Sequence, residues 1–264
     1  MIAYFITIPI IAYLSMIAFR TMELSVMNFE GKRVPYSLGV VIIFSYSFLY
    51  AHTPHLEKSL SIASFIFVLA IWLLGLIDDV FGKPYPKGLK GHVIYFLKNK
   101  KVTTGLVKAI GTVVATILYL FSSETRSLIT YMIAFLLLTG IPHVMNLFDT
   151  RPLRVWKLTL CCTIFILALS PLPSFLFVVM VLTLFYIWYV LEGYRKAMLG
   201  DNGATLVGAI LAIVIINQLT ITVQYGLLLF VLVLILAAEK YSFSALIENS
   251  SFLKAVDRLG VIKK

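Results

Sequence analysis

Four aspartates stand where apolar segments meet polar loops, at three well-separated places in the chain. Asp78 and Asp79 end the apolar run that closes with GLI, and Asp149 follows an apolar segment ending in MNLF. Asp201 precedes a third apolar segment. A carboxylate at the edge of a membrane helix loses hydration, so such placement is usually functional. Each aspartate alone has an ordinary alternative as a solvated helix end, an N-cap or the partner of Arg151, but the joint pattern favours one shared site.

The chemistry that suits this set is phosphoryl transfer assisted by a hard divalent cation. Mg²⁺ needs one or two carboxylates together with substrate phosphates and retained waters, and Mn²⁺ is the alternative ion. Glycines flank Asp201 and would let backbone approach a phosphate at the positive end of a helix. The same loops carry polar side chains that could hold an anionic substrate: Lys83, Lys90, His92, Asn146, Arg151 and Arg154. For His92, simple solvation explains the residue equally well.

The elements that must position these residues are membrane helices. Of the 264 residues, 61% are hydrophobic and 13% are charged, and a soluble globule of this size cannot bury so much apolar surface. The apolar runs approach the roughly 20 residues that a helix needs to cross a bilayer. We therefore expect an all-α polytopic membrane protein of about nine spans, near residues 2–20, 35–51, 60–77, 103–121, 127–143, 156–170, 174–191, 203–217 and 223–238.

The distribution of positive charge predicts the orientation of these spans. With nine spans, all but two of the 22 Lys and Arg residues fall on one side, the exceptions being Lys58 and Arg126. Lys and Arg concentrate on the cytoplasmic side of membrane proteins. We therefore expect the N-terminus outside, the C-terminus in the cytoplasm, and all four aspartates at the cytoplasmic face. The same rule and anionic headgroups explain the net charge of +10 without nucleic acid.

Two further features have unremarkable explanations. The first apolar run has no basic segment before it, so we expect span one to be a permanent anchor rather than a cleavable signal peptide. Cys161 and Cys162 are adjacent within a span, and we interpret them as packing residues because a strained vicinal disulfide is improbable.

Four stretches, in order, resemble the polyprenyl-phosphate N-acetylhexosamine-1-phosphate transferase superfamily, which includes phospho-N-acetylmuramoyl-pentapeptide transferase. NFEGKRVPYSLG (28–39) is similar to its first inner loop, and GLIDDVFGK (75–83) to its paired-aspartate motif. MNLFD (145–149) resembles its asparagine and aspartate motif, and MLGDNGATLVG (198–208) its MGDxGS motif. No single motif is specific, but four motifs in this order with matching topology are a strong signal of the family.

The resemblance implies transfer of a sugar-1-phosphate from a UDP-sugar to undecaprenyl phosphate at the cytoplasmic face of a bacterial membrane, with release of UMP. It implies Asp201 as the Mg²⁺ ligand, and Asp78 and Asp79 acting at the lipid phosphate, with Asp78 as the general base. Asn146 and Asp149 would order the nucleotide side.

This chain departs from the family pattern in three ways. Asp149 leads into TRPLRVWK rather than a second glycine-rich DGL repeat, no histidine occurs between residues 239 and 264, and the predicted spans are one fewer than the usual ten. Residues 1–240 are expected to form the membrane domain. Residues 241–264 form a cytoplasmic amphipathic tail, which either lies along the interface as a lid in place of the missing histidine loop or is a plain surface tail.

Two other functions compete with an active transferase. A non-catalytic descendant would bind polyprenyl phosphate or act in envelope assembly, and loss of the histidine motif favours it. Retention of four aspartates favours the enzyme, since a lipid binder gains little from buried like charges. A secondary transporter would need midplane charges and repeat symmetry, which this sequence lacks.

Overall fold

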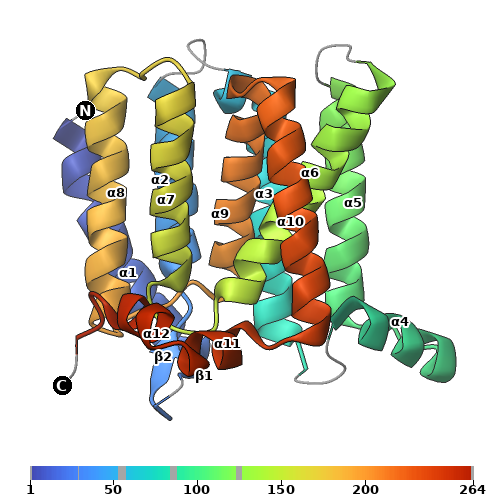
Figure 1. The fold of residues 1–264 in the computed structure, drawn as a ribbon. Coiled ribbons are helices and arrows are strands. Elements are labelled where there is room, and N and C mark those ends of the chain that lie inside the picture. Colours follow the sequence, from blue (N-terminus) through green and yellow to red (C-terminus); the bar gives the residue numbers. More distant parts are fainter. Residues whose placement is uncertain (1, 29, 53–57, 84–87, 123–126, 263–264) are drawn as a thin grey trace.

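The computed structural model describes residues 2–28, 30–52, 58–83, 88–122 and 127–262 of the chain. Apart from one short hairpin, its described elements are helical, and the long helices stand side by side in a single bundle (Figure 1). The N-terminus lies at the upper end of Figure 1 and the C-terminus at the lower end. The all-α prediction is confirmed.

Seven described helices are long and apolar enough to cross a membrane. They are α1 (Ile2–Thr21), α3 (Ile62–Phe81), α5 (Thr104–Ser122), α6 (Leu128–Phe148), α8 (Phe175–Gly193), α9 (Gly200–Gln218) and α10 (Ile221–Lys240). The predicted count of nine is therefore wrong. The other two predicted spans form α2 (Leu38–His52) and α7 (Arg154–Leu169), of 15 and 16 residues. Both are shorter than a full span, yet both lie alongside the long helices in Figure 1.

Short elements cover the lower end of the bundle, where the sequence indicated loops. The first loop forms an antiparallel hairpin of β1 (Ser25–Met27) and β2 (Arg33–Pro35), paired through Val26 and Val34. Helix α4 (Gly88–Asn99) follows α3 and projects sideways (Figure 1). A 3-10 turn η1 (Lys58–Leu60) precedes α3, at the opposite end of that helix from α4. The C-terminal segment forms α11 (Phe243–Asn249) and α12 (Ser251–Arg258) across the same end.

Helix α9 is the centre of the bundle and packs most extensively against α3 and α6. Glycine permits the close contact with α3: a Cβ on Gly75 would lie 2.6 Å from the Cα of Asn202. Small residues at helix contacts allow such approach in membranes, where dispersion forces rather than the hydrophobic effect hold helices together. The closeness of α3 and α9 brings Asp78 and Asp79 to the beginning of α9.

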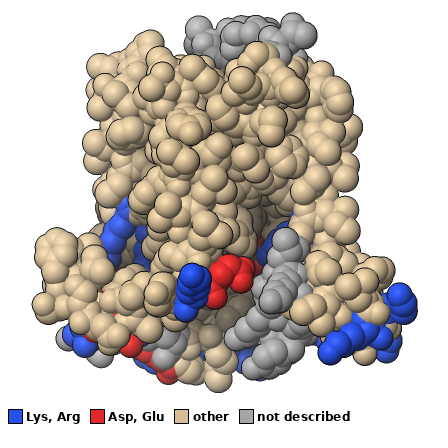
Figure 2. Space-filling view, turned by 45° about the vertical axis from the view of Figure 1, so that its right-hand side comes forward, with Lys and Arg blue, Asp and Glu red and all other residues tan. Residues whose placement is uncertain are grey.

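Charged side chains gather at one end of the molecule. On the face drawn in Figure 2 the lysine, arginine, aspartate and glutamate atoms lie in the lower part, and the larger upper part is uncharged. Many large apolar side chains on the bundle are exposed, among them Ile10, Ile66, Leu118, Phe230 and Leu236. A helical bundle with an apolar exterior and one charged end is a multi-pass membrane protein in form. The predicted outer residues Glu57, Glu124 and Arg126 lie outside the described residues.

Candidate active site

A lysine joins two of the four aspartates. The ammonium of Lys108, one turn into α5, lies 2.6 Å from Oδ2 of Asp78 at the end of α3 and also contacts Oδ2 of Asp201 at the start of α9. The side chains of Lys108 and Asp78 are 19% and 15% exposed. Thr104, at the start of α5, adds a hydrogen bond to Asp78. Three helices thus bring two carboxylates to a single cation position.

Asp79 holds the beginning of α9. Its Oδ1 accepts the backbone N–H of Asp201 at 2.9 Å, and its Oδ2 accepts the backbone N–H of Asn202 at 2.8 Å and the side-chain Nδ2 of Asn202 at 2.7 Å. The first N–H groups of a helix have no partner within it, so Asp79 acts as an N-cap supplied by another helix. The sequence suggested that the N–H groups at the start of α9 bind a phosphate. In the structure the carboxylate of Asp79 accepts hydrogen bonds from these groups.

Two neighbouring residues fix the Asp79 cap in place. Gly200 adopts φ +65°, and a Cβ there would lie 2.8 Å from Cβ of Tyr36 and 2.9 Å from Oδ2 of Asp79, so a larger residue is excluded. The buried amide of Asn202 also donates to the carbonyl of Tyr36 at 3.1 Å. Burial, with the charge of Asp79, raises the pKa of Tyr36. The tight packing leaves no room for Asp79 to leave α9 without moving the loop before α2.

Asp149 lies on the other side of the Gly200 turn. It follows α6 directly, and its carboxylate accepts a backbone hydrogen bond from Gly200. Burial raises the pKa of Asp149 well above its ordinary value, and the negative charges of Glu192, Asp201 and Asp79 raise it further. All four predicted aspartates therefore meet around the start of α9. Asn146 lies one turn before Asp149, and its buried Oδ1 has no hydrogen-bond partner among the described residues.

A cavity of about 210 Å³ opens beside Asp149. It lies between the β1–β2 hairpin, the loop after α6 and the end of α8, and we call it the hairpin cavity. Its wall includes Asn28, Asp149, Arg151, Glu192 and Arg195. The carboxylate of Glu192 accepts the indole N–H of Trp188 at 2.7 Å and a backbone hydrogen bond from Leu153. Leu153 is fully buried at φ +65°, a strained conformation for leucine, so Glu192 helps hold the loop that carries Arg151.

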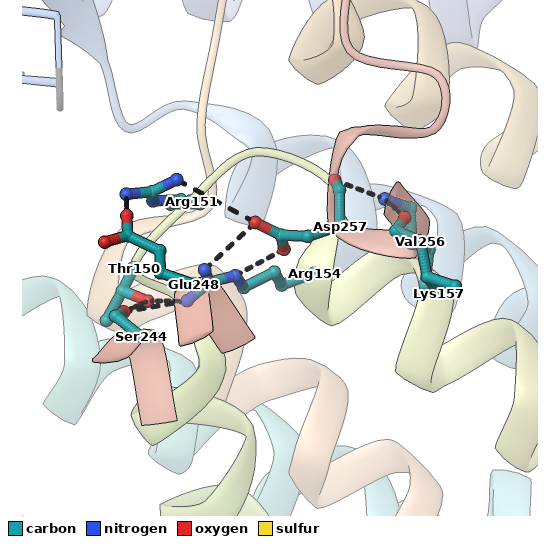
Figure 3. Close-up of polar contacts among 8 residues, drawn as sticks. All are labelled: Thr150, Arg151, Arg154, Lys157, Ser244, Glu248, Val256 and Asp257. Atoms are coloured by element: carbon teal, nitrogen blue, oxygen red, sulfur yellow. Dashed lines mark hydrogen bonds and ion pairs between the residues drawn. The ribbon is translucent and has the colours of Figure 1, made fainter. Parts of the chain in front are cut away.

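The predicted phosphate-binding Arg154 is occupied by the C-terminal segment (Figure 3). Its Nε and Nη2 donate to the two carboxylate oxygens of Asp257 at 2.6 and 3.0 Å, and Nη1 donates to Thr150 and Ser244. Lys157 donates to the carbonyls of Val256 and Asp257 at the end of α12. Because these contacts satisfy the guanidinium of Arg154, it is a structural clamp for α12 in this conformation.

Arg151 is also paired with the C-terminal segment, through Glu248 of α11, but the two side chains are 29% and 45% exposed. Unlike Arg154, Arg151 lines the hairpin cavity. Of the two arginines that the sequence offered for a diphosphate, only Arg151 lies where a ligand could reach it.

The remaining predicted residues follow α3 or belong to α4. Lys83 is exposed just after α3. His92 of α4 is half-buried, and its Nδ1 is 2.8 Å from the hydroxyl of Thr103. It therefore anchors α4 at the start of α5. Lys90 lies in α4, and its side chain is outside the part of the chain that the structure describes.

A magnesium ion fits this site only with help from substrate. Within the described residues, no group of three or more His, Cys, Asp and Glu side chains is arranged to hold a metal. Asp78 and Asp201 nevertheless converge on one cation position. Two carboxylates with phosphates and waters are a normal Mg²⁺ environment. The donor set therefore fits Mg²⁺ shared with a phosphate ligand and does not fit an all-protein cage.

Sequence reasoning missed Lys108 and Glu192. Lys108 is the single charge inside an otherwise apolar run from Val102 to Phe121, and that isolation was the signal for a buried ion pair. Glu192 stands at the end of another apolar run and gave the same signal. Comparisons of this chain with protein-family models, with curated proteins and with solved structures found no match.

Proposed function

We propose that this protein transfers a sugar-1-phosphate from a UDP-sugar to undecaprenyl phosphate at the cytoplasmic face of a bacterial membrane. The observation that carries the proposal is the convergence of Asp78, Lys108 and Asp201 from three helices, with Asp79 and Asp149 packed around it. The four-motif resemblance supplies the identity of the two substrates. Carboxylates and a lysine at a membrane border suit transfer between a lipid phosphate and a soluble diphosphate.

In the proposed reaction a lipid phosphate oxygen attacks the donor phosphorus that bears the sugar. The bond from that phosphorus to the UMP phosphate breaks, and UMP leaves with the bonding electron pair. Lys108 neutralises phosphate charge, and Asp78 accepts the proton if the lipid phosphate arrives protonated. Asp78 and Asp201 would hold Mg²⁺, or Mn²⁺ in its place, once Lys108 has moved from between them to a phosphate oxygen, and the ion would supply further charge neutralisation. Asp79 positions α9, while Asn146, Asp149 and Arg151 face the nucleotide side.

We propose that the charged end of the bundle faces the cytoplasm. The positive-inside rule supports this orientation, since Arg20, Lys98, Arg151, Lys196 and Lys240 all belong to segments at that end. The N-terminus is then outside. The soluble donor reaches the aspartates from the cytoplasm, and the lipid phosphate arrives at headgroup depth.

A non-catalytic polyprenyl-phosphate-binding protein is the second candidate, and Lys108 is the observation that favours it. Its ammonium takes the position between Asp78 and Asp201 that a divalent cation would need. A permanently bound internal cation would leave a site that recognises a lipid phosphate without activating a donor.

Release of UMP separates the two candidates. Purified protein would be given undecaprenyl phosphate, Mg²⁺ and a panel of UDP-sugars, with UMP and the lipid product measured together. The transferase proposal predicts equal amounts of UMP and sugar-diphospho-lipid for at least one sugar. Binding of undecaprenyl phosphate without UMP release for any sugar would favour the binding protein and overturn the enzyme.

A further inference from the structure

The hairpin cavity has a donor side and an acceptor side. Donors come from Arg151, Arg195 and Asn28, whose buried Nδ2 has no hydrogen-bond partner in the described part of the chain. Acceptors come from Asp149 and Glu192. A ligand that fits carries negative charge on one part and hydroxyl or N–H groups on another.

Glutamates of this chain currently hold both arginines of the cavity. Glu248 of α11 contacts Arg151, and Glu30 of the hairpin contacts Arg195. In both pairs the carboxylate belongs to a surface segment, and Figure 3 shows Glu248 reaching Arg151 from α11. A carboxylate and a phosphate bind a guanidinium in the same forked geometry, so each glutamate occupies a position that a phosphate group could take.

Two of the ion pairs that attach the C-terminal segment differ in exposure, and a third joins Arg151 to Asp257 at 4.0 Å. Arg154 and Asp257 have side chains only 4% and 8% exposed and bond at two atoms each. Arg151 and Glu248 are 29% and 45% exposed. Exposed pairs contribute little and exchange readily, whereas breaking a buried pair leaves an uncompensated charge. Helix α12 is therefore fixed. Helix α11 is fixed at its start, where Ser244 contacts the buried Arg154 and Phe243 stacks on Phe148, and its end is held at Glu248 by a contact that a ligand can replace.

We propose that the hairpin cavity binds a diphosphate group through Arg151, and that Glu248 is a built-in competitor which the ligand displaces, freeing the end of α11 while the start of α11 and all of α12 stay clamped. The choice of a diphosphate rests on the proposed function. The competition itself rests on the Arg151–Glu248 contact at the wall of the cavity. The C-terminal segment is then a ligand-responsive cover of the site and not a plain surface tail.

Amide hydrogen exchange tests this proposal with inorganic pyrophosphate as the probe. Full-length protein in detergent would be compared with and without pyrophosphate, using sodium chloride to match ionic strength. We expect pyrophosphate to raise exchange at the end of α11, around Glu248 and Asn249, and to leave α12 (Ser251–Arg258) unchanged. Glu248→Gln should show raised exchange at the end of α11 without pyrophosphate and should bind pyrophosphate about two- to fivefold more tightly, the gain expected from removing an exposed competitor.

Glu239→Gln is the matched control, because this substitution removes the same charge at a position away from Arg151. Glu239 is exposed near the end of α10. It should leave pyrophosphate affinity and α11 exchange at wild-type values. Three results overturn the proposal: pyrophosphate does not bind, it binds without releasing the end of α11, or Glu239→Gln acts like Glu248→Gln. If pyrophosphate releases the end of α11 but the protein liberates no UMP, the transferase proposal is wrong and the proposed ligand site stands. If the protein liberates UMP but the end of α11 is not released, the ligand site is wrong and the transferase proposal stands.

Discussion

Lys108 is the residue on which the aspartate cluster depends most. Without its ammonium, the carboxylates of Asp78 and Asp201 would face each other uncompensated. Removing one partner of a buried pair costs roughly 3–5 kcal/mol, and because Asp201 is 34% exposed we expect about 2–3 kcal/mol for Lys108→Met. Thermal unfolding in detergent measures this loss. Lys98→Met, at an exposed position of α4, is the control and should unfold like the wild type.

The same variant tests for a metal without any assay of turnover. If Asp78 and Asp201 can hold Mg²⁺, millimolar Mg²⁺ should restore part of the stability lost in Lys108→Met, because the ion replaces the missing ammonium. The double variant Lys108→Met with Asp201→Asn should not respond. A Lys108→Met protein that melts at one temperature with and without Mg²⁺ would refute the proposed metal position.

Asp149 predicts a dependence of stability on pH. Because burial and neighbouring negative charge raise the pKa of Asp149 above its ordinary 3.8, its contribution to stability is present below 3.8 and is lost as pH rises through the raised pKa. We therefore expect Asp149→Asn to be more stable than the wild type at neutral pH, and this advantage should shrink on acidification. Unfolding midpoints of both proteins from about pH 4 to about pH 8 measure it. A pH-independent difference would contradict the shift.

At the scale of elements, the close contact between α3 and α9 positions the site. A Cβ on Gly75 would lie 2.6 and 2.7 Å from backbone atoms of Asn202 and Asp201, which cannot rotate away. Gly75→Ala should therefore separate the two helices and destabilise the protein by about 1–3 kcal/mol. Gly226→Ala in α10, where a Cβ meets no atom within 4 Å, should be neutral or slightly stabilising. Equal unfolding temperatures for the two variants would show that the contact is not tight.

The sequence predicted which helix ends carry the site, because carboxylates at the edges of apolar runs are visible without a structure. It did not predict what each carboxylate does. The capping by Asp79 depends on how closely α3 approaches α9, and the pairing of Lys108 depends on how α5 packs against α3; neither follows from a pattern along one segment. The predicted role of Arg154 also depended on where residues 241–262 lie.

At the scale of the whole molecule, composition predicted the membrane bundle, while the span count failed for a local reason. The apolar run near 35–51 includes Pro35 of the hairpin, so α2 is shorter than that run suggests, whereas the run near 156–170 is itself short of a full span and α7 matches it. Helix α4 and the β1–β2 hairpin were read as loops, because segments of this length form regular structure mainly through tertiary packing.

The orientation of the bundle can be measured by cysteine labelling in intact cells. In a variant lacking Cys161 and Cys162, we expect a cysteine at Leu172, in the turn between α7 and α8, to react with an impermeant reagent added outside. Cysteines at Lys98 and Lys196 should react only after the cells are opened. Labelling of Lys98 or Lys196 positions in intact cells would place the aspartates on the wrong side for a cytoplasmic donor.

The central claim is that the aspartate cluster is a phosphoryl-transfer site, and turnover of Asp201→Asn tests it most directly. The substitution keeps the size of the side chain and removes the charge that faces Lys108. With undecaprenyl phosphate, Mg²⁺ and the UDP-sugar that the wild type uses, we predict that UMP release by Asp201→Asn falls at least about a hundredfold, as for loss of a principal electrostatic group, while expression and thermal unfolding stay near wild type. An Asp201→Asn protein that releases UMP at the wild-type rate would contradict the account.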